Sequence, residues 1–123
     1  MCGIFGIAVK DDLAISKSLI KSLANQLFLL SATRGKEAAG VAINNGVSIN
    51  TYKKAGDPWR FIKSRQYRSL FSDTYRVYKD LYIDKQQTDT TSFSLIGHSR
   101  LVTNGCQSNE SNNQPLNFKN FVG

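Results

Sequence analysis

The second residue of the chain is a cysteine, and its position gives it two reactive groups once Met1 is removed. Methionine is usually trimmed before a small residue, so Cys2 would carry the free α-amino group. An α-amine has an unperturbed pKa of about 8, which suits a general base at neutral pH. One residue then supplies both the nucleophile and its base, as in enzymes with an N-terminal threonine. The position of Cys2 therefore allows covalent catalysis, although position alone favours a buried cysteine that packs as a small apolar side chain.

Three further segments place polar side chains among glycines, in this order: TRGKEAAG at 33–40, GHSRLVTNG at 97–105 and NNQP at 112–115. The second contains one arginine, Arg100, whose planar guanidinium can bind a carboxylate through two parallel hydrogen bonds. His98 is the only histidine, and Cys2 and Cys106 are the only cysteines. These residues form neither a metal-binding spacing nor a disulfide framework, so the sequence predicts no metal site.

Together with the opening MCGIFG, these segments resemble class II glutamine amidotransferase domains, which are N-terminal-nucleophile hydrolases. The resemblance covers nearly the whole chain, and four matches in one order are more specific than any single motif. It implies that Cys2 hydrolyses the side-chain amide of glutamine to glutamate and ammonia, with no cofactor or metal. The ammonia would then aminate a second substrate in a synthase domain of the same polypeptide.

The same resemblance implies a role for each matching residue. Cys2 corresponds to the nucleophile, and Arg100 to the arginine that binds the α-carboxylate of glutamine. Thr103 corresponds to a threonine that helps to hold this carboxylate. The expected substrate-binding residues are thus Arg100, Thr103 and Asn104. Those with a structural or supporting role are Arg34, Gly35 and His98.

Two departures from the family pattern bear on which synthase the chain would serve. Leu101 stands where many relatives have Trp or Tyr, and Asn104 stands where glucosamine-6-phosphate synthases have His. The motifs look most like those of amidophosphoribosyltransferases and glucosamine-6-phosphate synthases. Asparagine synthetases remain an alternative, because Arg100–Leu101 and 114–116 (QPL) resemble theirs. A non-catalytic regulatory or binding domain on the same scaffold is a further alternative.

The charge balance is basic, with 16 Lys and Arg against 9 Asp and Glu. Arginines and lysines alternate with aromatic residues over 60–76, which leaves a nucleic-acid-binding module as another alternative. We favour a solvated helix face with its aromatic residues turned inward, and therefore expect no nucleic-acid partner. The chain lacks a signal peptide pattern and any long apolar run, so we expect a cytoplasmic protein without a membrane segment. Whether the full-length protein forms a homo-oligomer is left open.

Hydrophobic periodicity and turn residues predict the elements that must position these side chains. A strand is expected over Cys2–Val9, followed by a helix that Asp11 or Asp12 caps and that ends near Ala32. Asn45–Gly46 predicts a hairpin between strands at 41–43 and 47–52. Asp57–Pro58 begins a helical region that continues, with a break, to about residue 81. The remaining expected elements are a loop at 86–92, a strand at 93–98, a loop at 103–113 and a hairpin at 116–122 that turns near 117–120.

This order predicts an α+β fold with largely antiparallel sheets. The resemblance implies the four-layer αββα sandwich of N-terminal-nucleophile hydrolases. Residues 1–123 would form the N-terminal part of one such domain, incomplete at the C-terminus, with the synthase domain downstream. In relatives a His-Asn-Gly motif follows a similar strand and supplies the oxyanion hole. On this reading residues 1–123 alone would be a poor glutaminase.

Overall fold

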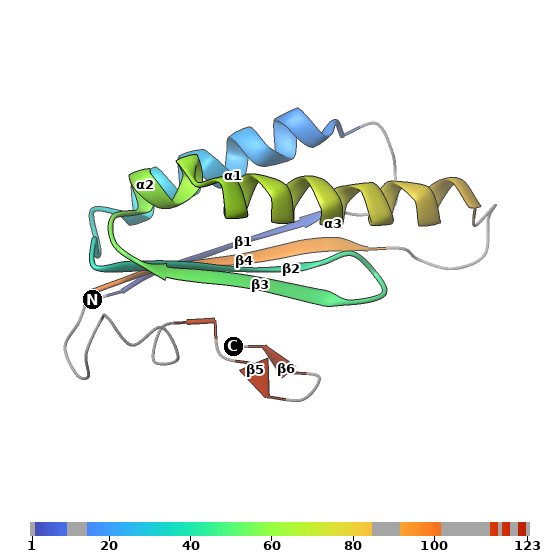
Figure 1. Cartoon of the computed structure of the whole chain (residues 1–123). Helices are drawn as coiled ribbons and strands as arrows, with labels where there is room; N and C mark the ends of the chain where they lie inside the picture. The colour runs from blue at the N-terminus through green and yellow to red at the C-terminus, as the bar shows by residue number, and fades with distance from the viewer. Residues whose placement is uncertain are drawn as a thin grey trace.

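The computed structural model describes residues 2–9, 15–84, 92–101, 114–115, 117–118 and 121–122 (Figure 1). The elements are β1 (Gly3–Val9), α1 (Lys17–Ser31), β2 (Ala38–Asn44), β3 (Ile49–Ala55), α2 (Pro58–Lys63), α3 (Arg65–Asp84), β4 (Phe93–Arg100), β5 (Asn117–Phe118) and β6 (Phe121–Val122). The predicted order of strands and helices is confirmed, although several boundaries differ.

Helix starts follow local side-chain capping. The expected cap at Asp11 or Asp12 is wrong, because Ser16 precedes α1 and its side chain accepts a hydrogen bond from the Leu19 N–H at 3.2 Å. Asp57 caps α2 as expected, and its carboxylate accepts from the Trp59 N–H at 2.7 Å. The expected break is Ser64, whose extended backbone separates α2 from α3. A capping side chain satisfies donors that the first helical turn leaves free, which explains these starts.

Four strands form one sheet in the order β1-β4-β2-β3, and every neighbouring pair is antiparallel. The β2–β3 hairpin is longer than expected, because its strands extend to Ala38 and Ala55. Its turn is held by Asn45, whose side-chain oxygen accepts from the N–H of Val47 at 3.0 Å and of Ser48 at 2.8 Å. Gly46 in this turn has a φ of 92°, which glycine adopts without steric cost.

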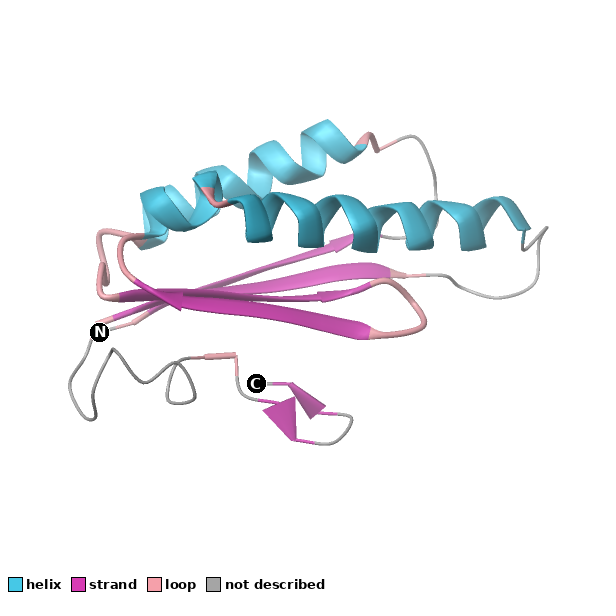
Figure 2. Cartoon of the chain, in the orientation of Figure 1, coloured by secondary structure: helices cyan, strands magenta, loops and turns pink. Residues whose placement is uncertain are grey.

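The helices cover one face of this sheet (Figure 2). Aromatic rings fill the space between the two layers, with Phe28 at the centre. Its ring lies 4.7 Å from that of Phe5, 5.1 Å from that of Phe61 and 5.8 Å from that of Tyr67. Rings at these separations favour edge-on or tilted contacts, which hold α1, α2 and α3 against the sheet.

The opposite face of the sheet carries no helix among the described elements, and the β5–β6 pair lies on that side (Figure 1). Part of the expected hairpin turn is wrong, because Asn117 and Phe118 are in a strand. The second large sheet and the second helix layer of an αββα sandwich stay a prediction. The expected loops at 86–91 and 103–113 lie outside the described residues.

Candidate functional site

Cys2 lies immediately before β1, at one end of the sheet. Its side chain is exposed, and its thiol donates to the carbonyl oxygen of Leu101, with 3.8 Å between sulfur and oxygen. Leu101 directly follows β4. The end of the chain that would carry the reactive amine is therefore in contact with the segment that contains GHSR. Met1 lies outside the described residues, so its removal stays a prediction.

Arg100 is the last residue of β4, beside Cys2. Gly3 pairs with Ser99 in the β1–β4 ladder, and Cys2 precedes Gly3 as Arg100 follows Ser99. Side chains alternate between the two faces of a sheet. Those of His98 and Arg100 therefore lie on one face, and that of Ser99 lies on the other. Ser99 contacts α1, so His98 and Arg100 lie on the face that the helices leave uncovered. The thiol and the guanidinium thus belong to neighbouring positions at one end of the sheet.

The loop from α1 to β2 packs against the end of β4. A Cβ on Gly35 would overlap the backbone of Arg100 and Leu101, so only glycine allows this approach. The Glu37 N–H donates to the Arg100 carbonyl at 3.1 Å, and the Arg34 N–H donates to the Ser31 carbonyl at 2.9 Å. The loop therefore holds the backbone on which the Arg100 side chain stands.

Ser99 joins this site to α1, a contact that the sequence interpretation missed. Its hydroxyl is fully buried and donates to the Ser31 carbonyl at 2.6 Å. A Cβ on Gly3 would lie 2.7 Å from both the Ser31 Cβ and the Ser99 Oγ, which is too close for a side chain. The signal was present in GHSR, because strand alternation turns Ser99 away from Arg100 and toward the helices.

His98 lies between Ile4 of β1 and Gly40 of β2, and its side chain is 5% exposed. Burial lowers the pKa of His98, and the positive charge of Arg100 lowers it further. Both effects disfavour the imidazolium, so the ring is neutral at physiological pH. A neutral, buried ring beside Arg100 is consistent with the expected supporting role.

Gln114 and Pro115 lie over Gly40, next to His98 in the sheet. A Cβ on Gly40 would overlap the Gln114 carbonyl oxygen and would come within 2.7 Å of the Pro115 Cδ. Lys53 pairs with Gly40 and donates from its Nζ to the Pro115 carbonyl at 3.3 Å. Gln114 and Pro115 therefore meet Gly40, a residue far away in sequence, on the helix-free face.

Residues that the sequence singled out converge at this end of the sheet: Cys2, Arg34, Gly35, His98 and Arg100. Thr103, Asn104 and Cys106 lie outside the described residues. Within the described ranges, no three His, Cys, Asp or Glu side chains gather as a metal would require. No helix among the described residues has the length and apolarity needed to cross a membrane.

The chain is similar to an amidophosphoribosyltransferase of Methanocaldococcus jannaschii, with 32% identity over 123 residues. The match covers all of this chain but only 21% of that protein, so the chain spans about a fifth of its relative. No family model matches the sequence. The matched region runs through every residue of the site.

Proposed function

We propose that this chain is the glutamine-hydrolysing part of a class II amidotransferase, with Cys2 as its nucleophile. The observation that carries the proposal is the neighbouring position of Cys2 and Arg100 at one end of the sheet. The similarity of this chain to a fifth of an amidophosphoribosyltransferase supports it as well. In a reducing compartment such as the cytoplasm, the exposed thiol of Cys2 stays free to react.

The reaction begins when the Cys2 thiol passes its proton to the α-amine of the same residue. The sulfur then attacks the side-chain amide carbon of glutamine, and the C–N bond breaks. The protonated amine returns a proton to the departing nitrogen, which leaves as ammonia. Water next attacks the γ-glutamyl thioester, which releases glutamate and restores the thiol. No redox change occurs at any step, and no metal or cofactor is required.

Arg100 binds the α-carboxylate of glutamine in this proposal. Its guanidinium has the fork geometry that matches a carboxylate, and its strand is held from both sides by β1 and β2. Thr103 and Asn104 follow closely in sequence and complete the substrate contacts. Arg34, Gly35 and His98 support this strand and its end, and the α-amine of Cys2 carries the proton transfer in this proposal.

We further propose that the ammonia passes to an acceptor domain of the same polypeptide. The similarity to an amidophosphoribosyltransferase favours that branch over the glucosamine-6-phosphate synthase and asparagine synthetase branches. In that case the acceptor would be a phosphorylated pentose, and residues 1–123 would supply only its nitrogen. The acceptor could be identified by measuring which sugar phosphate stimulates glutamine hydrolysis by the full-length protein.

The test of the nucleophile compares Cys2→Ala with Cys106→Ala in the full-length protein. Cys2→Ala should lower ammonia release from glutamine by roughly 10⁴–10⁶-fold, the loss seen when a nucleophile is removed. Cys106→Ala should keep nearly normal turnover. A glutamine-like electrophile should label Cys2 alone, and intact-mass measurement should show a chain that begins at Cys2. An active protein that retains Met1 would contradict the self-base mechanism.

A further inference from the structure

A small cavity lies at the other end of the sheet, where β1 finishes at Val9. Its volume is about 210 Å³, and Val9, Ile15 and Ile83 form the apolar part of its lining. β1 separates this cavity from Cys2, because the cysteine precedes the first residue of the strand and Val9 is its last. The proposed hydrolysis of glutamine makes no use of the cavity.

Three tyrosines from one face of α3 form the wall of the cavity: Tyr75, Tyr78 and Tyr82. The Tyr75 hydroxyl donates to the Ile15 carbonyl at 2.9 Å, which ties α3 to the residue before the cap of α1. The Tyr78 ring is buried and lies 5.4 Å from the ring of Phe93. The Tyr78 ring also lies 6.5 Å from the ring of Tyr82, which is exposed. The wall is therefore aromatic and held in place on its inner side.

Lys79 is the one charged residue among the described residues that line the cavity. It follows Tyr78 on α3 and is exposed, so this charged residue of the lining is open to solvent. Apolar cavities with one or two polar groups bind ligands that place an apolar body inside and a polar group at the entrance. Aromatic walls favour a flat ring, because ring edges and faces attract one another. An ammonium favours an anion.

We propose that this cavity binds a small planar aromatic acid, with its ring packed against the tyrosine wall and its acidic group at Lys79. Such a ligand is chemically unrelated to glutamine, which is aliphatic and zwitterionic. The site would be a second binding site, on the opposite end of the same sheet from the proposed nucleophile. The proposed site is tested independently of the proposed glutaminase activity, because the measurement is ligand binding.

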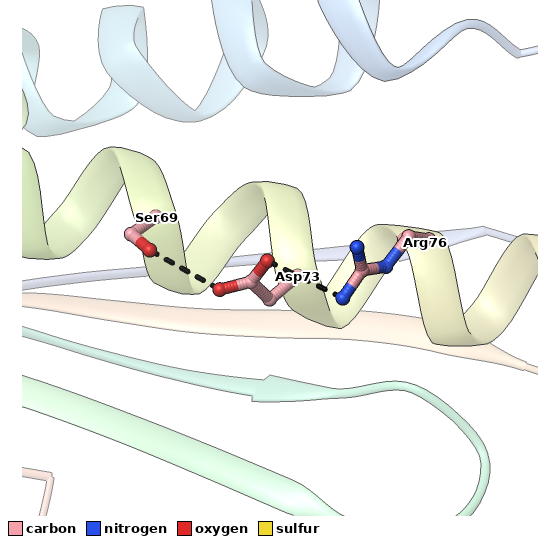
Figure 3. A network of polar contacts seen from close by, with 3 residues as sticks. All are labelled: Ser69, Asp73 and Arg76. Atoms are coloured by element: carbon pink, nitrogen blue, oxygen red, sulfur yellow. Dashed lines mark hydrogen bonds and ion pairs between the residues drawn. The ribbon is translucent and has the colours of Figure 1, made fainter.

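Equilibrium dialysis of the full-length protein against indoleacetate, with indole as the uncharged probe, tests the charge. We expect millimolar or tighter binding of indoleacetate, in the range of small ligands. Lys79→Met should weaken it about tenfold, as for loss of a charged hydrogen bond, and should leave indole binding unchanged. Arg76→Met is the matched control, because Arg76 is on α3 but does not line the cavity. Its guanidinium lies 3.7 Å from the Asp73 carboxylate, which also accepts from Ser69 (Figure 3).

A second pair of variants tests the location without relying on the charge. Ile83→Trp introduces a large ring from an exposed lining position and should abolish binding of both probes. Val77→Trp is made on the same helix at an exposed position outside the lining, and should bind normally. Equal effects of the two tryptophans would overturn the proposed location. Equal binding of indoleacetate by Lys79→Met and the unmodified protein, or no binding of either probe, would overturn the proposed ligand class.

Discussion

On the helix-covered face of the sheet, aromatic rings pack against one another, whereas the opposite face presents glycine, alanine, His98 and Arg100. The same strands supply both sets. In β4, Phe93 and Leu95 are buried under the helices. His98 and Arg100 occupy the alternate positions of the same strand, so they belong to the opposite face. The difference shows that a strand can be held by the helices through one face while its opposite face carries residues of the candidate site. Substitutions on the two faces should therefore separate stability from activity.

The largest effect on stability is expected from Phe28→Ala, at the centre of the helix-covered face. Phe28 is fully buried and contacts three other rings, so removing it should cost about 3–5 kcal/mol. Leu30→Ala is the matched control, because Leu30 is on the same helix but is 68% exposed. Hydrogen exchange of the β4 amides in the full-length protein measures the change. Similar exchange in the two variants would mean that the aromatic layer does not hold the sheet.

Arg100→Ala should have a large effect of a different kind, on substrate binding. Loss of one member of a charged pair typically costs about 2–5 kcal/mol, so the KM for glutamine should rise by roughly 30-fold or more. Arg100→Lys should restore only part of the affinity, since an ammonium lacks the planar fork. Steady-state kinetics measure KM and kcat separately. An unchanged KM in Arg100→Ala would remove Arg100 from the carboxylate site.

Ser99→Ala should give a smaller effect on both stability and the reactivity of Cys2. The buried Ser99 hydroxyl donates to Ser31, but this carbonyl also accepts from the Arg34 N–H. The carbonyl would keep one partner, so we expect a cost of only about 0.5–1.5 kcal/mol. Labelling of Cys2 by an electrophile should slow at the same time, because Gly3 packs on Ser99. A loss of stability with unchanged labelling would mean that Ser99 stabilises the fold but does not affect Cys2.

The smallest effect concerns pH and His98. Burial and the nearby Arg100 lower the pKa of His98 in the folded protein. The unfolded chain, with a histidine pKa of about 6.5, then binds a proton at a pH where the folded protein does not. Stability should fall as pH drops below about 6.5, by at most roughly 1.4 kcal/mol per pH unit. His98→Gln should reduce this slope in unfolding experiments across that range, while an unchanged slope would assign it to other groups.

The chain sequence by itself determined the elements and the residues to examine. Apolar periodicity predicted the strand that begins at Cys2 and the helix that follows, because burial of one face is a local requirement. A helix start was predicted from Asp57–Pro58 and a turn from Asn45–Gly46, because caps and turns depend on the residues that form them. The resemblance then singled out Cys2 and Arg100 without any knowledge of their distance.

Only the tertiary structure decided how these residues meet. The strand order β1-β4-β2-β3 brings the first and last long strands together, and no local pattern encodes that pairing. The contacts at Gly35, Gly40 and Ser99 join segments that are distant along the chain, so they appear only after these segments have folded against one another. The tyrosine-lined cavity has the same origin, because Val9 and Tyr82 line one cavity only when α3 packs on the sheet. Long-range contacts depend on the packing of whole elements, and the local sequence carries the propensity of each element alone.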